Sequence, residues 1–186
     1  MLNTILASLS EGIAPSTTAY ESIATVTVGS GGSSSIDFTS IPSTYTHLQV
    51  RGITRTTTGG LDINQIRFNS DTGSNYATHR IEANGSSVSA TATASTVCIN
   101  GGLQSGSSTL SNTFGAMVFD ILDYANTNKY KTLRHLDGID ANGTGLMGFG
   151  SGLWMNTNAI TSITIFTFGT DFAQYSQFAL YGIKGS

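Results

Sequence analysis

The sequence predicts an all-β protein folded as an antiparallel β-sandwich. Asp, Glu, Lys and Arg make up only 10% of its 186 residues, and Ser, Thr and Asn supply most of the polarity beside 22 glycines. Thr favours strands, whereas Gly, Ser and Asn favour the turns between them. Short segments that alternate apolar and polar residues recur at intervals typical of sandwiches. Both observations indicate many short strands packed around one core.

A hairpin in the middle of the chain is the clearest single element. Residues 114–122 are almost entirely apolar, which predicts a strand buried on both faces. Residues 125–128 form a polar turn, and residues 129–136 return as the second strand. We expect this hairpin to form the centre of the sandwich.

The remaining strands are expected at regular intervals, nine or ten in all. They are assigned to residues 23–28, 36–38, 47–55, 63–68, 76–82, 162–168 and 174–183. Residues 88–99 are rich in Ala, Ser and Thr, which favours either an exposed edge or the close approach of another backbone. Residues 101–112 are interpreted as a polar loop, and the glycine-dense residues 138–152 as an ordered surface loop.

The first residues differ from the rest of the chain, so we divide it into an arm and linker, residues 1–18, and a sandwich domain, residues 19–186. Leu2, Ile5, Leu6 and Leu9 have the spacing of one helical face. Their burial would contribute about 6–12 kcal/mol. Ordering about ten residues costs a similar amount, at ~1–2 kcal/mol each. We therefore expect the arm to dock on a partner protein or on copies of the chain; packing on its own domain is the alternative.

The charge pattern argues against a nucleic acid partner, and the lengths of the apolar runs argue against a membrane span. The net charge is −3 and the eight basic residues are scattered, whereas phosphate binding requires clustered Lys and Arg. The one local basic group, Lys129, Lys131 and Arg134, is interpreted as a solvated strand face. No apolar run approaches the length of a membrane span.

The sequence contains no recognisable catalytic, cofactor or metal site, and we expect a protein that is not an enzyme. There is no G-x-S-x-G elbow, and His47, His79 and His135 lack the spacing of metal ligands. The remaining features are each explained by turns or by the core. They are the lone Cys98, the oxygen-rich turn of Asp137, Asp140 and Asn142, and the glycines Gly143, Gly145 and Gly148.

Aromatic side chains leave two possibilities open. Trp154, Tyr45, Tyr76, Tyr124 and Tyr130 could form a platform on which a sugar stacks, or could belong to the core or an interface. Core or interface is the favoured interpretation, because large aromatic side chains dominate both.

Several segments resemble small virion structural proteins of tailed bacteriophages. They are YESIATVTVGSGG at 20–32, IDF at 36–38, IPSTYTHL at 41–48, DTGSNY at 71–76, YANTNKYKT at 124–132 and FALYGI at 178–183. The resemblance covers most of residues 20–183. It implies a jelly-roll-like sandwich displayed in many copies on a virion, without catalytic residues. Head decoration proteins and tail proteins both occur in this group.

Taken with the apolar arm, the resemblance leads to a specific expectation. The protein would be a capsid cement or decoration protein on the outer surface of the phage head, a homotrimer that bridges neighbouring subunits of the major capsid protein. The alternative is a tail fibre or tail-associated module that binds host surface carbohydrate.

Overall fold

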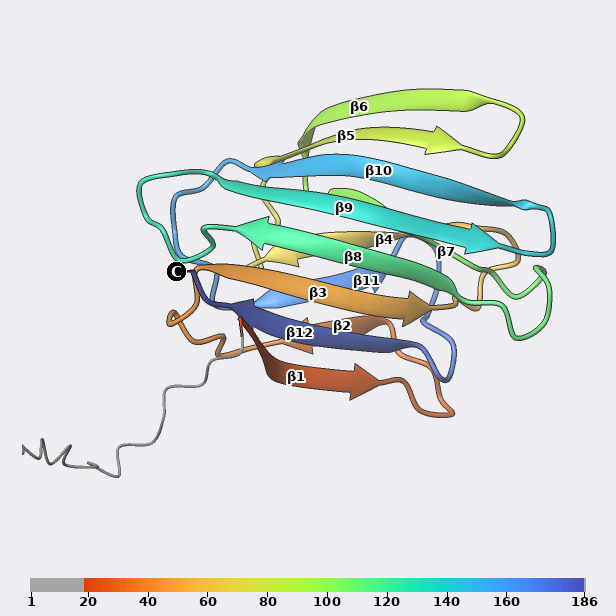
Figure 1. Ribbon diagram of the computed structural model, residues 1–186, viewed down its shortest axis with the longest axis horizontal. Coiled ribbons are helices and arrows are strands. Elements are labelled where there is room, and N and C mark those ends of the chain that lie inside the picture. Colours follow the sequence, from red (N-terminus) through yellow and green to blue (C-terminus); the bar gives the residue numbers. More distant parts are fainter. Residues whose placement is uncertain (1–18, 186) are drawn as a thin grey trace, which may run out of the picture.

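The computed structural model describes residues 19–185 as two antiparallel β-sheets packed face to face, which confirms the predicted β-sandwich (Figure 1). The larger sheet has eight strands in the order β1 (Tyr20–Thr27), β12 (Gln177–Ile183), β3 (His47–Thr54), β8 (Gly115–Leu122), β9 (Lys131–Asp140), β10 (Gly145–Trp154), β5 (Tyr76–Ala83) and β6 (Val88–Thr96). The smaller sheet has the order β2 (Ser35–Phe38), β11 (Ile163–Thr167), β4 (Asp62–Phe68) and β7 (Ile99–Gln104).

Eight of the strands have the connectivity of a jelly roll. Four strand pairs are nested in sequence, as the successive parts of one long hairpin would be: β1–β12, β2–β11, β3–β8 and β4–β7. When such a hairpin is wound into a roll, successive strand pairs enter the two sheets alternately. The larger sheet thus contains β1-β12-β3-β8, and the smaller sheet is β2-β11-β4-β7. The fold is therefore jelly-roll-like, as expected from the resemblance.

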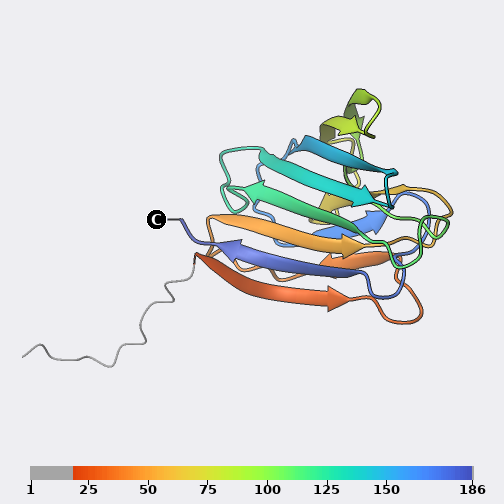
Figure 2. The ribbon, with the colours of Figure 1, turned by 45° about the vertical axis from the view of Figure 1, so that its right-hand side comes forward.

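Two further hairpins enlarge one side of this roll. β5–β6 is inserted between β4 and β7, and β9–β10 between β8 and β11. Both insertions join the larger sheet beyond β8, in the order β9-β10-β5-β6. Figures 1 and 2 show that the β5–β6 hairpin projects past the smaller sheet. All nine residues of β6 are exposed or half-buried, so this segment is the exposed edge strand that its composition allowed.

The core lies between the sheets and follows the strand alternation. Leu48 and Val50 of β3 are buried, as are Ile36 and Phe38 of β2 and Ile66 and Phe68 of β4, as predicted. The middle hairpin is also confirmed, because β8 and β9 pair from Ala116 and Gly138 to Leu122 and Thr132 at the centre of the larger sheet.

One aspect of that hairpin was predicted wrongly. The apolar run of residues 114–122 suggested burial on both faces, but β8 alternates between buried and half-buried or exposed residues. Met117, Phe119 and Ile121 face the core, whereas Ala116 and Val118 face outward. The described residues thus leave the second apolar face of the strand uncovered.

Two predicted loops are strands. Residues 99–104 form β7 and residues 145–154 form β10. Three glycines of β10, Gly148, Gly150 and Gly152, point inward, where larger neighbours take the space. A Cβ on Gly148 would lie 2.6 Å from Oδ2 of Asp137, and one on Gly152 would collide with Ile99. Glycine content here reflects close packing within a sheet and not a turn.

Three of the five aromatic residues considered for a sugar platform are core residues. Trp154 is 1% exposed and stacks on Tyr76 with ring centroids 6.3 Å apart, and Tyr124 is fully buried. The indole Nε1 of Trp154 donates a hydrogen bond to Oδ2 of Asp71 at 2.7 Å. Tyr45 is partly buried, and Tyr130 is exposed. The favoured core interpretation is therefore correct for Trp154, Tyr76 and Tyr124, and these three rings are not open to a sugar.

Tyr76 makes the fold sensitive to alkali. Burial raises the pKa of its phenol from 10.0 to about 12. Because the folded pKa is the higher one, the contribution to stability is complete below pH 10 and is lost as pH rises from 10 to about 12. Between pH 8 and pH 11 we expect the wild type to lose about 1.4 kcal/mol more unfolding free energy than Tyr76→Phe. Chemical denaturation at the two pH values measures this difference, and equal losses would contradict it.

Candidate interaction surface

The outward face of the larger sheet carries two adjacent rows of apolar side chains. In the first row Val118 pairs with Leu136, Leu136 with Phe149 and Phe149 with Ile81. Ile81 in turn pairs with Ala90 on the edge strand. The strands thus place residues distant in sequence side by side, because cross-strand neighbours share one face.

The second row runs beside the first. Ile53 pairs with Ala116 and Met147 with Ala83, with Gly138 between Ala116 and Met147. Ala83 pairs with Val88 at the edge. We call the two rows the outer apolar face; its large side chains are Ile53, Ile81, Val88, Leu136, Met147 and Phe149.

These six side chains are well exposed. Phe149 and Leu136 each expose 56% of their surface, and Met147 exposes 60%. Single exposed apolar residues are common on soluble proteins, but contiguous rows of them mark interaction sites. A polar row lies on one side of the face, where Asp120 pairs with Arg134 and Arg134 with Ser151. The apolar character is therefore confined to one part of the sheet.

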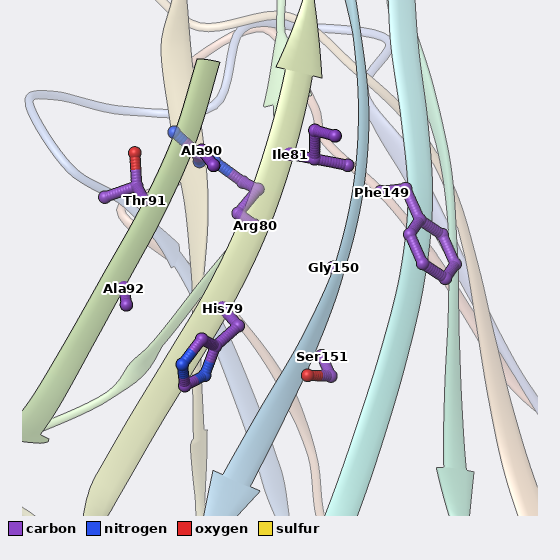
Figure 3. A pocket seen from close by; sticks show the side chains of 9 residues that line it. All are labelled: His79, Arg80, Ile81, Ala90, Thr91, Ala92, Phe149, Gly150 and Ser151. Atoms are coloured by element: carbon purple, nitrogen blue, oxygen red, sulfur yellow. The ribbon is translucent and has the colours of Figure 1, made fainter. Parts of the chain in front are cut away.

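The face is hollowed in two places. One hollow of about 760 Å³ lies over β8, β9 and β10 and is lined by Val118, Leu136 and Met147, with residues 143–145 at one end. The other, of about 400 Å³, lies between β10, β5 and β6, where Phe149, Ile81 and Ala90 come from three strands (Figure 3). The two hollows have no lining residue in common, so the surface is shaped as well as apolar.

A buried acid–histidine pair lies beneath this face. Nδ1 of His135 is 2.5 Å from Oδ1 of Asp137, and both side chains are fully buried. The other carboxylate oxygen, Oδ2, accepts a hydrogen bond from the Leu103 amide at 2.9 Å. Nε2 of His135 has no hydrogen-bond partner among the described residues. The pair links β9 to β7 across the core.

The sequence indicated neither this pair nor the burial of Lys131. Lys131 was interpreted as part of a solvated basic group, but its side chain is completely buried. Its Nζ donates to the carbonyl oxygens of Asn126 at 2.6 Å, Lys129 at 2.9 Å and Thr157 at 2.9 Å. Burial lowers the pKa of Lys131 below its ordinary value of 10.5. Lys129 and Arg134 are exposed, as expected for the other two members.

The remaining candidate residues occupy separate places. His47 accepts a hydrogen bond on Nδ1 from the Asp123 amide at 3.0 Å, and His79 is exposed at the smaller hollow. Asp140 accepts from the Gly143 amide at 3.1 Å in the β9–β10 turn. Cys98 is buried, and burial raises the pKa of its thiol. The arm residues Leu2, Ile5, Leu6 and Leu9 lie outside the described residues.

Within residues 19–185, no three His, Cys, Asp or Glu side chains gather closely enough to hold a metal ion. The same part of the chain includes no helix with the length and apolar character needed to cross a bilayer. Comparisons of the chain with protein-family models, curated proteins and solved structures gave no match.

Proposed function

We propose that the protein is a non-enzymatic structural subunit of a tailed-phage virion, a decoration protein that stabilises the head by bridging subunits of the major capsid protein. The outer apolar face is the observation that carries the assembly role. The virion setting rests on the segments in residues 20–183 that resemble phage structural proteins.

The mechanism is burial of surface between subunits. Each apolar side chain removed from water at such an interface contributes about 1.5–3 kcal/mol, and a lattice of copies multiplies a modest contact. A subunit that binds the closed shell but not its open form raises the work of opening it. The scarcity of charge on the two rows suits a contact made by packing instead of ion pairs.

A double substitution on the face tests this role. We expect Leu136→Ser with Phe149→Ser to lower binding to phage heads that lack the protein by at least tenfold, because two exposed anchors lose their contact. The unfolding free energy of the isolated chain should change by less than about 1 kcal/mol, because both side chains already face solvent. Co-sedimentation with heads and denaturant unfolding give the two readouts.

Phe168→Ser is the matched control, because Phe168 exposes 76% of its surface just after β11, away from this face. It should bind heads as the wild type does. Binding by the double variant at wild-type strength would contradict the proposed contact. Heads that gain no heat resistance from the wild-type protein would contradict the cement role itself.

The smaller hollow supports a second candidate, a tail-associated module that binds carbohydrate. There an exposed ring, Phe149, lines the same hollow as the polar side chains of His79 and Ser151, a combination that suits a sugar ring. A glycan array separates the candidates: specific binding that Phe149→Ser abolishes would favour the tail module.

A further inference from the structure

Asparagine is followed directly by glycine at three places in the chain, and the structure gives the three pairs different surroundings. They are Asn84-Gly85 in the β5–β6 turn, Asn100-Gly101 in β7 and Asn142-Gly143 in the β9–β10 turn. In such a pair the amide nitrogen of the glycine can attack the side-chain carbonyl of the asparagine, because the glycine has no Cβ to block the approach. The surroundings therefore decide which of the three pairs can react.

The pair in β7 is held by the sheets. Oδ1 of Asn100 accepts a hydrogen bond from Nε2 of Gln65 at 2.8 Å, and the Asn100 amide donates to Oγ1 of Thr78 at 3.1 Å. Gly101 is buried against an imidazole, since a Cβ there would lie 2.8 Å from Cδ2 of His135. Attack by the Gly101 nitrogen requires the backbone and the side chain to rotate, and these contacts oppose both rotations.

The pair in the β5–β6 turn is exposed, but its carboxamide is engaged. Oδ1 of Asn84 accepts hydrogen bonds from the amides of Ser86 at 3.0 Å and Ser87 at 2.8 Å, and from the Ser87 hydroxyl at 3.2 Å. Local bonds of this kind fix an asparagine side chain over the residues that follow it. The carboxamide would have to leave this position before the Gly85 nitrogen could attack it.

The pair in the β9–β10 turn combines a free carboxamide with a nearby proton acceptor. Asn142 is exposed, and its side chain has no hydrogen-bond partner within residues 19–185. The amide nitrogen of Gly143, which is the attacking group, donates a hydrogen bond to Oδ1 of Asp140 at 3.1 Å. The carboxylate is thus within reach of the proton that this nitrogen must lose.

We propose that Asn142 is a site of spontaneous deamidation in which Asp140 transfers the proton. The Gly143 nitrogen forms a bond to Cγ of Asn142 while its proton passes to Asp140, and the carboxyl group then delivers that proton to the departing side-chain nitrogen. The C–N bond of the carboxamide breaks, ammonia leaves and a cyclic succinimide remains. Water opens the succinimide to aspartate or isoaspartate, so the net change is replacement of the amino group by a hydroxyl group.

The reaction changes one end of the larger hollow, which Asp140, Gly143 and Thr144 help to line. An ionised aspartate at position 142 adds one negative charge to the net charge of −3 and places a second carboxylate in the same turn. Isoaspartate also lengthens the main chain of a tight turn in which the Ala141 amide donates to the Thr144 carbonyl at 2.6 Å. This chemistry does not depend on the assembly role proposed above, although it alters the same surface.

Peptide mapping by mass spectrometry, applied to the full chain aged at neutral pH, tests the selectivity. We expect deamidation at Asn142 to be about tenfold or more faster than at Asn84 or Asn100, because only there is a carboxylate placed to transfer the proton. In denaturant the three sites should react at similar rates, since glycine follows each of them. Equal rates at the three sites of the folded protein, or a faster reaction at Asn84, would overturn the proposal.

Asp140→Asn tests the part played by the carboxylate. The new amide oxygen can still accept the hydrogen bond from Gly143, but it cannot carry the proton, so deamidation at Asn142 should slow by about tenfold or more. Asn84 in the same variant is the internal control and should react at its wild-type rate. Denaturant unfolding verifies that the variant remains folded. An unchanged or faster reaction at Asn142 would show that Asp140 does not promote it and would overturn the proposal.

Discussion

Gly150→Ala is expected to destabilise the sandwich by about 3 kcal/mol or more, because overpacking a core costs ~1–3 kcal/mol and here the backbone is also in the way. A Cβ at this position would lie 2.7 Å from the carbonyl oxygen of His79 on β5 and would collide with Nε2 of His135. The carbonyl belongs to the β5–β10 ladder and cannot move without breaking it. Denaturant unfolding followed by Trp154 fluorescence measures the loss.

The control for this prediction is Gly31→Ala. A Cβ on Gly31 meets nothing within 4 Å, so the change should alter stability by less than about 0.5 kcal/mol. A double variant, Gly150→Ala with His135→Ala, should lose less than the sum of the two single changes, since part of the clash is removed. Additive losses would show that the imidazole is not what excludes a side chain at position 150.

Lys131→Met is expected to cost about 2–4 kcal/mol, the second largest effect, because buried acceptors that lose their donors cost ~1–3 kcal/mol each. The ammonium group holds the carbonyls of Asn126, Lys129 and Thr157, which come from two separate loops. Methionine fills similar volume but donates nothing. Lys129 and Thr157 are exposed residues, so water partly hydrates their carbonyls in the variant. The cost therefore stays below that of three unsatisfied buried acceptors.

The neighbouring lysine is the matched control for this change. Lys129 is exposed and forms an ion pair with Asp123 at 2.6 Å, so Lys129→Met should cost no more than about 1 kcal/mol. Thermal or denaturant unfolding at pH 7 compares the two variants. Equal effects at positions 129 and 131 would contradict the role assigned to the buried ammonium group.

The sequence predicted correctly those strands whose apolar side chains pack between the two sheets. Alternation in residues 36–38, 63–68 and 76–82 located strands correctly, because one face of each packs between the sheets. It failed for β10, where Gly148, Gly150 and Gly152 face inward against Asp137, His135 and Ile99. Those partners come from β9 and β7. The glycines of β10 are therefore required by side chains on other strands, which the local sequence of β10 does not reveal.

The sequence indicated part of the outer apolar face, but as a strand face buried inside the protein. The apolar run at 114–122 predicted burial on both faces, and the outward side of β8 is uncovered in residues 19–185. Hydrophobic pattern reports that a side chain is suited to burial, but it does not say which molecule buries it. Leu136 and Phe149 could not be placed beside Val118 without the register of β8, β9 and β10.

Image reconstruction by electron microscopy of a phage particle that carries the protein is the most direct measurement of the central claim. The account predicts that the outward sides of β9 and β10, with Leu136 and Phe149, are buried against a neighbouring subunit. A reconstruction in which those two side chains face open solvent, and the copies touch one another and the shell through other strands, would contradict it.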